Sequence, residues 1–569
     1  MNVTEATHSS REARRYQRPP EQLMQLSRLG CFHASRLSFM RVLLRRLYLD
    51  NWQFKQQTFA IDNSGEGYAV YTAQCEQSIY SLVAFAHDLP DSLRSDRVIA
   101  ERWDTTFTLF DGVPSAADIA RLQANVPLQE AGRISEKELS LSRANRSGRL
   151  WSYVIDCLAM GNQPDSDMIK QTGYLMRTTA VYGSGKFGAA DREVIAERPE
   201  FSGPFQVEML HVYLIRWFVR DLANALAKAQ GGDKATTLDA GIARLLGIGN
   251  STGLGMAPFI VNHPVLFNNW ISAREMAIAK VCQLANADES AVALFSACFD
   301  ASQVSVDNWQ TRHPIQIEKL TVLRAELSQL AQYLQSFDWQ QSRPWQALFD
   351  WVQDTLGADA QELFASLMLE PYPELVDGLA HCMLAPASSP LIDGGLSIAR
   401  LRQTIESRAN WALKTDWEAP DNRARVWYIS EEKLEPRLGE RFEEDIADYE
   451  QPLCTGKRIA ELYQLTTDCE TKTVGDFLFR HPQHRETVKR VLRLNTHPYA
   501  EIQDNTIEKT MLPIDMLRCK LSFFGATHFD PRSDRWVRIV MFQHAPYPDE
   551  LHAENYDYWP YNGGLLHGG

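Results

Sequence analysis

The stretch from Leu245 to Ala273, LLGIGNSTGLGMAPFIVNHPVLFNNWISA, constrains the fold of this chain most strongly, because its 29 residues include no Lys, Arg, Asp or Glu. Its prolines, histidine and asparagines exclude a lipid-exposed transmembrane helix, in which helix-breaking and polar groups cost too much free energy. The stretch must therefore be buried in protein, where its amides, hydroxyls and imidazole need hydrogen-bond partners. Its glycines, at positions 247, 249, 253 and 255, let backbone N–H groups approach a neighbour closely.

These properties predict that the stretch lines a pocket. Asn250, Ser251 or Thr252 is expected to cap the helix that follows, whose N-terminal end would then face the pocket and favour an anion. Gly253 and Asn262 are expected in the same lining. His263 is the candidate for proton transfer, because the unperturbed pKa of imidazole lies near neutral pH. The alternative is a packed turn whose polar groups satisfy one another.

A second glycine-rich stretch runs from Met176 to Glu193 and matches GxGxxG. A dinucleotide-binding unit is not supported, because Pro199 follows soon after and residues 205–227 have a helical pattern where a second strand is required. The stretch also lacks the Walker A pattern for ATP. What remains is a loop with donors suited to a carboxylate or phosphate, or else a turn with a solvated lysine. The donors are Arg177, Ser184, Gly185 and Lys186, with Lys186 also a candidate catalytic residue.

A third pattern concerns iron. Glu208 and His211 have the ExxH spacing of helix-borne ligands in carboxylate-bridged di-iron bundles, and Asp377 with His381 offers a second pair. The set is incomplete, since such a site takes two further glutamates. Both spacings also arise often by chance, and Glu208 could instead pair with Arg216 while His211 fills a core position.

Charge and cysteines bound the function class. The chain has 58 basic and 72 acidic residues, a net charge of −14, which disfavours general nucleic-acid binding. Nine scattered cysteines without a CxxC pair, and no apolar core in the first 25 residues, predict reduced thiols in a cytoplasmic protein without a secretory signal. Residues 1–48 are basic and are expected to dock as a helix on the acidic remainder, or alternatively to lie on a membrane surface.

The β-propensity and helical patterns predict an α+β fold that is predominantly helical. An N-terminal antiparallel meander is expected over residues 54–61, 68–73, 79–85, 97–102 and 105–110. A C-terminal hairpin of residues 517–524 and 536–542 is expected to join the same sheet. A leucine seam from Leu320 to Leu334 predicts internal helix packing rather than a dimer. The predicted segments are a basic helical segment (1–48), a β meander (49–114), one or more mainly helical domains with the pocket (115–510), and a β hairpin with a tail (511–569).

We therefore expect a cytoplasmic enzyme that acts on a small anionic metabolite, with no transmembrane segment and no nucleic-acid partner. Two alternatives remain open: a helical-bundle di-iron oxidase, and a non-catalytic scaffold or interaction protein. The sequence identifies no cofactor; the NAD and ATP patterns are not supported, and iron belongs only to the di-iron alternative. The sequence does not determine the reaction type or the oligomeric state, and it is compatible with a homo-oligomer.

Overall fold

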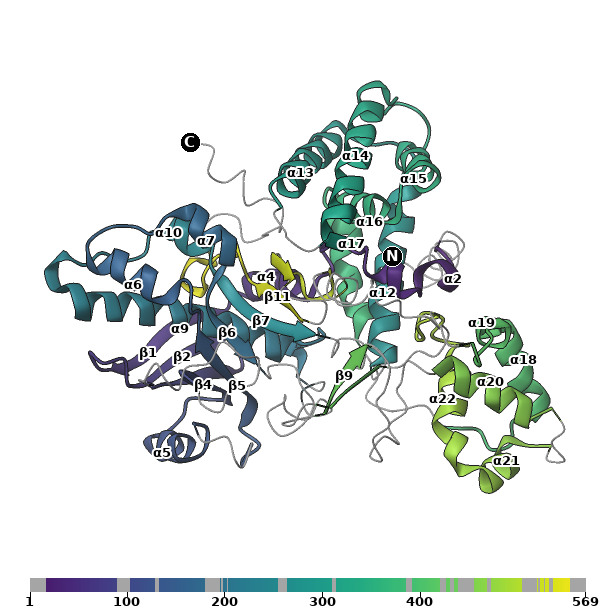
Figure 1. Ribbon diagram of the computed structural model, residues 1–569, viewed down its shortest axis with the longest axis horizontal. Coiled ribbons are helices and arrows are strands. Elements are labelled where there is room, and N and C mark those ends of the chain that lie inside the picture. Colours follow the sequence, from purple (N-terminus) through teal and green to yellow (C-terminus); the bar gives the residue numbers. More distant parts are fainter. Residues whose placement is uncertain are drawn as a thin grey trace.

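The fold was analysed in a computed structural model of the whole chain. The described residues are mainly 17–87, 103–127, 133–179, 198–201, 203–253, 263–309, 314–384, 391–419, 426–429, 434–438, 455–467, 472–503, 522–526, 528–531 and 536–552. Helices dominate, and a large mixed sheet occupies one side of the molecule (Figure 1). The α+β prediction is confirmed.

The sheet has nine strands in the order β1-β2-β3-β4-β5-β6-β7-β11-β10. Their bounds are β1 (Gln53–Ile61), β2 (Gly67–Gln74), β3 (Ile79–Ala86), β4 (Thr105–Asp111), β5 (Glu138–Arg146), β6 (Tyr174–Thr179), β7 (Gly247–Gly253), β10 (His528–Pro531) and β11 (Trp536–Met541). Neighbouring strands are antiparallel except β6 and β7, which are parallel. The first four form the predicted meander, and the C-terminal strands join the same sheet, as expected, with β11 paired to β7.

Two predicted strands need comment. Residues 517–524 were expected to form the first arm of the C-terminal hairpin, but residues 522–524 are helical. The partner of β11 is instead β10, which includes Asp530 and Pro531 of the expected connecting loop. Phe523 and Phe524 are buried among aromatic rings, and this packing overrides the β-propensity of the segment. The strand expected at residues 97–102 lies outside the described residues.

Helices cover both faces of the sheet. The long helix α9 (Gln206–Gly231) packs on one face, which we call the inner face, through rings such as Phe218 against Phe107 of β4. On the opposite or outer face, α5 (Ala116–Asn125) covers an apolar cluster that includes Val83, Phe85 and Leu141. Smaller helices on this side of the chain are α6 (Trp151–Ala159), α7 (Ser166–Thr172) and α10 (Ala240–Arg244).

A helical layer continues the core of the sheet. It comprises α12 (Pro264–Cys282), α13 (Glu289–Asp307), α14 (Pro314–Ser336), α15 (Pro344–Thr355), α16 (Ala358–Leu367), α17 (Pro373–Val376) and η5 (Asp377–Met383). The leucine seam of α14 is buried in this core from Leu320 to Leu330, so internal packing is confirmed. No described helix is long and apolar enough to cross a membrane. Seven cysteines among the described residues are free thiols: Cys31, Cys75, Cys157, Cys282, Cys298, Cys382 and Cys519.

A smaller helical unit with a hydrophobic core of its own stands apart from this layer (Figure 1). It contains α18 (Ile398–Arg408), α19 (Asn410–Lys414), α20 (Thr455–Leu465), α21 (Val474–Arg480) and α22 (Arg485–Arg493). A short hairpin, β8 (Val426–Ile429) with β9 (Leu434–Leu438), forms a second sheet.

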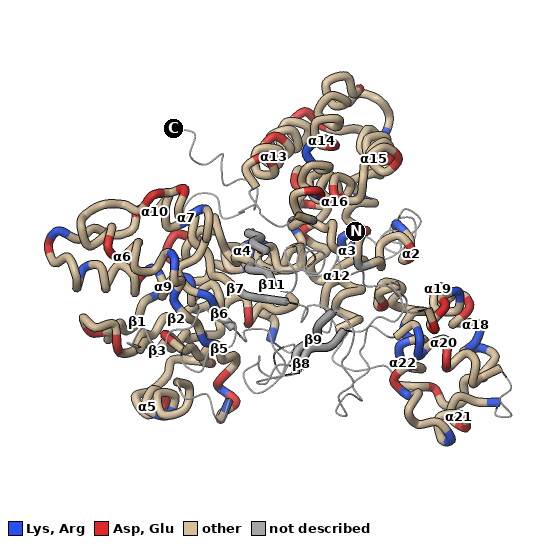
Figure 2. The backbone as a smooth tube through the Cα atoms, viewed as in Figure 1, with Lys and Arg blue, Asp and Glu red and all other residues tan. Residues whose placement is uncertain are grey.

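The basic N-terminal segment docks on the protein rather than projecting from it. Its helices α2 (Pro20–Leu23), α3 (Leu26–Leu29) and α4 (Phe39–Leu49) lie among α12 and α16 (Figure 2). Arg18 pairs with Glu275 at 2.7 Å and with Glu362 at 2.6 Å, and Arg41 pairs with Glu370 at 2.6 Å. Arginines of the basic segment thus form buried ion pairs with glutamates of the acidic remainder. This is the contact that docking of the segment requires.

Candidate functional site: a buried donor cluster on the outer face of the sheet

The parallel pair β6 and β7 differs from the other described strand pairs of the sheet. Helix α9 connects the two strands, so the chain forms a β-α-β crossover within an otherwise antiparallel set of described strand pairs. In such crossovers, ligands bind beyond the carboxyl ends of the strands. Arg177 lies near the carboxyl end of β6, and the predicted residues Ser184, Gly185 and Lys186 follow it along the chain but lie outside the described residues.

The register places Arg177 on the outer face. Thr178 pairs with Ala144, which belongs to the core beneath α9, and Met176 lies in the same core. Because side chains alternate along a strand, Arg177 between them points to the other side. Its direct partner on β5 is Asn145. Arg143 is the diagonal neighbour, at the roughly 7–8 Å typical of such positions.

Strand β4 adds hydroxyl groups to the same face. Phe107 packs on α9, so Thr106 and Thr108 on either side of it face outward. Thr106 lies directly opposite Arg143. We call the resulting set the donor cluster, and its members are Thr106, Thr108, Arg143, Asn145 and Arg177.

Three members of the donor cluster carry buried polar atoms without a hydrogen-bond partner. The exposed fractions are 0% for Thr106, 0% for Thr108 and 5% for Asn145. The atoms concerned are the two threonine Oγ1 atoms and Nδ2 of Asn145. The other end of the Asn145 amide is fixed, since Oδ1 accepts a hydrogen bond from the Asp104 amide at 3.1 Å. Buried polar atoms are usually paired; unpaired ones occur elsewhere among the described residues too, but here three lie on one face beside two guanidinium groups.

The electrostatics of the cluster are dominated by its two guanidinium groups. Arg177 is 4% exposed, and the Arg143 guanidinium lies 4.1 Å from the centre of the Trp103 ring. Burial lowers the pKa of Arg143, because desolvation penalises the charged form. The nearby carboxylate of Asp104 is directed at Arg146, accepting a hydrogen bond from its amide at 2.9 Å and pairing with its side chain at 3.6 Å. Positive charge and hydrogen-bond donors therefore collect on this part of the sheet.

The structure does not bring Asn250 to the same side. Asn250 pairs with Thr178 and with Ile539, so its side chain faces α9, and its amide nitrogen donates to the Thr178 carbonyl at 3.3 Å. The proposed cap of a following helix is wrong, because Asn250, Ser251, Thr252 and Gly253 all lie within β7. The side chains of Ser251 and Thr252, and the whole of Asn262, lie outside the part of the chain that the structure describes.

The first glycines of the uncharged stretch have a packing explanation. A Cβ atom at Gly249 would lie 2.7 Å from the ring of Tyr174, and one at Gly247 would lie 2.3 Å from the Met541 carbonyl. The close neighbours here are therefore protein groups of β6 and β11. This agrees with the packed alternative for residues 247–249.

His263 is half-buried and is the residue immediately before α12. Its ring meets Phe205 edge-on, with ring centres 6.5 Å apart. Phe205 precedes the first turn of α9, and His211 in the second turn of α9 contacts Ser142, which lies next to Arg143. His263 therefore lies beside the start of α9, the helix that covers the inner face, whereas the Arg177 side chain is on the outer face.

The two pairs of iron candidates lie on different elements, α9 and η5. His211 is buried on α9, with Nε2 3.3 Å from the Ser142 hydroxyl, and burial lowers its pKa to about 3. Glu208 is buried one turn earlier on the same helix. Asp377 pairs with Arg36 at 2.7 Å and with Arg45 at 3.3 Å, while His381 is exposed in η5. Among the residues that the structure describes, no group of three His, Cys, Asp or Glu side chains is placed to hold a metal ion.

Sequence reasoning missed four members of the donor cluster. Residues 115–510 were expected to be mainly helical, so β5, with the sequence ELSLSRANR, was not recognised as a strand. Its alternation of leucine and serine was the signal available. The threonines of β4 lie in a predicted strand, but nothing local indicates which face each one occupies.

No known protein family, curated protein or solved structure matches this chain. The site therefore rests on its own geometry.

Proposed function

We propose that this protein binds a small anionic metabolite, a carboxylate or a phosphate ester, at the donor cluster and acts on it as an enzyme. The observation that carries this proposal is the set of buried atoms without partners on Thr106, Thr108 and Asn145. An unpaired buried polar group costs roughly 1–3 kcal/mol, so a ligand that pairs with these groups recovers a substantial free energy on binding.

The chemistry of the cluster favours an anion over other ligands. Hydroxyl and amide groups can donate hydrogen bonds, and the guanidinium groups of Arg143 and Arg177 only donate. Hydrogen bonds from a guanidinium group to an anion are charge-assisted and stronger than those to a neutral ligand. A cation would meet two positive charges instead.

Catalysis is the second part of the proposal. His263 is the candidate acid–base group, because its imidazole is half-buried at the start of α12 and the unperturbed pKa of imidazole suits proton transfer near neutral pH. Lys186, which lies outside the described residues, stays a candidate for binding or catalysis. We place this activity in the cytoplasm, in keeping with the free thiols among the described cysteines.

Calorimetric titration with inorganic phosphate, glycerol phosphate, malate and citrate tests the binding step. A ligand present at a hundred times its Kd should add roughly 2.7 kcal/mol to the free energy of unfolding, which a thermal shift detects. Asn145→Asp keeps the oxygen that accepts the hydrogen bond from the Asp104 amide, and it replaces the unpaired Nδ2 donor by a negatively charged carboxylate oxygen. We expect it to weaken anion binding more than tenfold, because a charged hydrogen bond worth about 1.5–3 kcal/mol is lost and a repulsion is added.

The matched control is Asn162→Asp, which adds the same charge at an exposed position of the same part of the chain. It should bind the anion like the wild type. Failure of every anion in the panel to bind, or equal affinity in the two aspartate variants, would overturn the assignment of the site. If binding holds, loss of turnover in His263→Ala with an unchanged Kd would support the catalytic step.

A further inference from the structure

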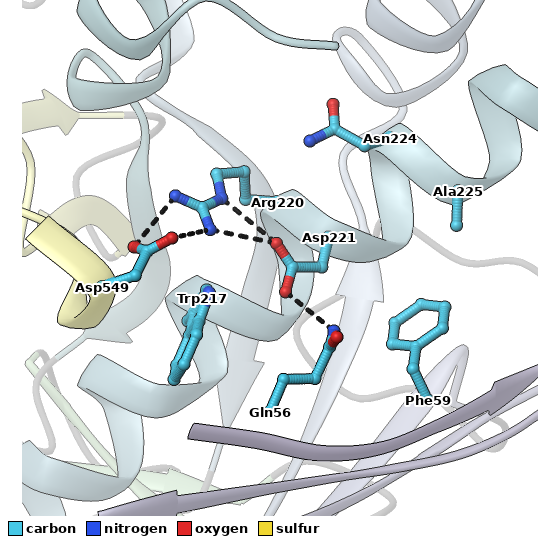
Figure 3. Close-up of a pocket in the computed structure, with 8 residues that line it drawn as sticks. All are labelled: Gln56, Phe59, Trp217, Arg220, Asp221, Asn224, Ala225 and Asp549. Carbon is cyan, nitrogen blue, oxygen red and sulfur yellow. Dashed lines mark hydrogen bonds and ion pairs between the residues drawn. The ribbon is translucent and has the colours of Figure 1, made fainter. Parts of the chain in front are cut away.

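A cavity of about 440 Å³ lies on the inner side of the sheet, the side opposite the donor cluster, between the edge strand β1 and the middle of α9. Figure 3 shows its walls: Gln56, Phe59, Trp217, Arg220, Asp221, Asn224, Ala225 and Asp549. The last residue belongs to η9 (Pro548–Glu550) near the end of the chain. None of these residues was singled out from the sequence, and the proposed anion function does not use them.

A β-bulge forms one wall. The register of β1 against β2 shifts between Gln56 and Thr58, so Gln57 is an extra residue. Gln56 pairs with Tyr71 and Phe59 pairs with Ala69, both of which belong to the core beneath α9. The bulge therefore turns Gln56 and Phe59 toward the same face, although they are three residues apart. Bulges that re-aim side chains in this way are common beside functional sites.

The opposite wall is a stripe of α9 with an ion-pair network. Asp221 accepts hydrogen bonds from the Tyr71 hydroxyl at 2.9 Å, from the Gln56 amide at 3.1 Å and from Arg220 at 3.1 Å. Arg220 also donates two hydrogen bonds to Asp549, at 3.1 and 2.6 Å. These contacts hold the polar groups in fixed orientations, as the dashed lines in Figure 3 show.

The same contacts leave donors and acceptors available to a ligand. The Gln56 amide uses its nitrogen for Tyr71 and Asp221, which leaves its carbonyl oxygen as an acceptor. Asn224 uses its oxygen to accept from the Leu238 amide at 2.9 Å, and its amide nitrogen is turned toward the Arg220 side of the cavity (Figure 3). The Asp549 carboxylate is 41% exposed. The rings of Phe59 and Trp217 supply apolar surface.

We infer that this cavity binds a neutral ligand with several hydroxyl groups, a free monosaccharide or cyclic polyol. Hydroxyls donate and accept at once, which matches an amide oxygen, an amide nitrogen and a carboxylate converging on one space. A second anion would meet two carboxylates, a cation would meet Arg220, and an apolar ligand would leave Gln56 and Asn224 desolvated without partners. The volume lies toward the lower end of small-molecule sites, about 300–1,000 Å³.

Saturation-transfer NMR with D-glucose, D-galactose, D-mannose and myo-inositol tests this inference on the full chain. At least one probe should show saturable binding at concentrations up to tens of millimolar. Gln56→Leu should weaken it about two- to tenfold, the effect of one neutral hydrogen bond, and Phe59→Ala should weaken it as well. Gln57→Leu is the matched control, because this neighbouring bulge residue is not part of the cavity wall, and it should bind like the wild type.

Gln56 and Gln57 are both exposed, so neither leucine variant is expected to unfold the protein, which circular dichroism checks. Absence of saturable binding by all four probes would overturn the inference. So would equal affinity in the Gln56→Leu and Gln57→Leu variants, or displacement of the bound probe by choline or phosphate. Phosphate binding that is weakened by Asn145→Asp but not by Gln56→Leu would belong to the donor cluster and would not count against this cavity. Each proposal can therefore be refuted without the other.

Discussion

Replacing Thr106 and Thr108 by valine should stabilise the ligand-free protein and weaken anion binding in the same variant. Both hydroxyls are fully buried and have no hydrogen-bond partner. Valine has nearly the same shape as threonine, so the substitution mainly removes an unpaired polar atom. Such an atom costs about 1–3 kcal/mol, and we expect each valine to raise the free energy of unfolding by roughly 1 kcal/mol. With an unfolding entropy of about 2.1 cal/mol/K per residue, roughly 1 kcal/mol corresponds to about 1 °C in Tm when the 569-residue chain unfolds as one unit.

Thr105→Val is the control on the adjacent residue, because it should lower the free energy of unfolding where the other two valines raise it. The Thr105 hydroxyl is buried toward α9 and donates to the Ala144 carbonyl at 3.4 Å. Losing this hydrogen bond should lower the free energy of unfolding by about 0.5–1.5 kcal/mol, with no change in anion affinity. Scanning calorimetry of the three single variants, with and without a bound anion, measures both quantities.

Two results would refute this reasoning. If Thr106→Val and Thr108→Val lower the Tm as Thr105→Val does, their hydroxyls have partners and the cluster is an ordinary packed surface. If they raise the Tm but leave the Kd of the anion unchanged, the unpaired hydroxyls do not contact the ligand. An anion contact to each hydroxyl instead predicts a rise in Kd of about tenfold or more.

Three further predictions follow from buried groups elsewhere. Burial alone would raise the pKa of Glu362, but Arg18 and two other arginines hold it well below its usual range; its stabilising contribution is therefore present above about pH 5 and lost as the pH falls. Glu362→Gln should cost about 3–5 kcal/mol and reduce this acid sensitivity in urea titrations run from about pH 7 down to about pH 2; an unchanged pH profile would contradict the ion-pair explanation. Burial lowers the pKa of His211 to about 3. Below the ordinary pKa of histidine, the unfolded state therefore binds a proton that the folded state does not, and the free energy of unfolding decreases as the pH falls. His211→Phe should remove a slope of about 1.4 kcal/mol per pH unit below about pH 6, and a retained slope would mean that another group titrates there. Gly249→Ala should cost about 1–3 kcal/mol through its clash with the Tyr174 ring, whereas Gly148→Ala, where nothing lies within 4 Å, should change the Tm little; equal Tm values would show that the ring moves aside.

The sequence alone determined those features that depend on local pattern. β-Branched and aromatic runs located the first strands of the sheet, and helical spacing located α9 and the leucine seam of α14. The uncharged stretch had to enter the protein, and β7 lies between β6 and β11 in the sheet. Each of these inferences uses neighbours along the chain, whose side-chain periodicity is set by the backbone geometry of a helix or strand.

Only the tertiary structure decided which side chains meet. Arg177 and Asn250 are close in the sheet but face opposite sides, because a shift of one position along a strand reverses the direction of a side chain. The partner of Arg177 is Asn145, from a strand that the sequence pattern did not reveal. The cavity beside α9 likewise depends on a one-residue bulge in β1 and on Asp549 near the far end of the chain. Strand register and long-range pairing are set by the packing of the whole core, and for that reason no local pattern could predict them.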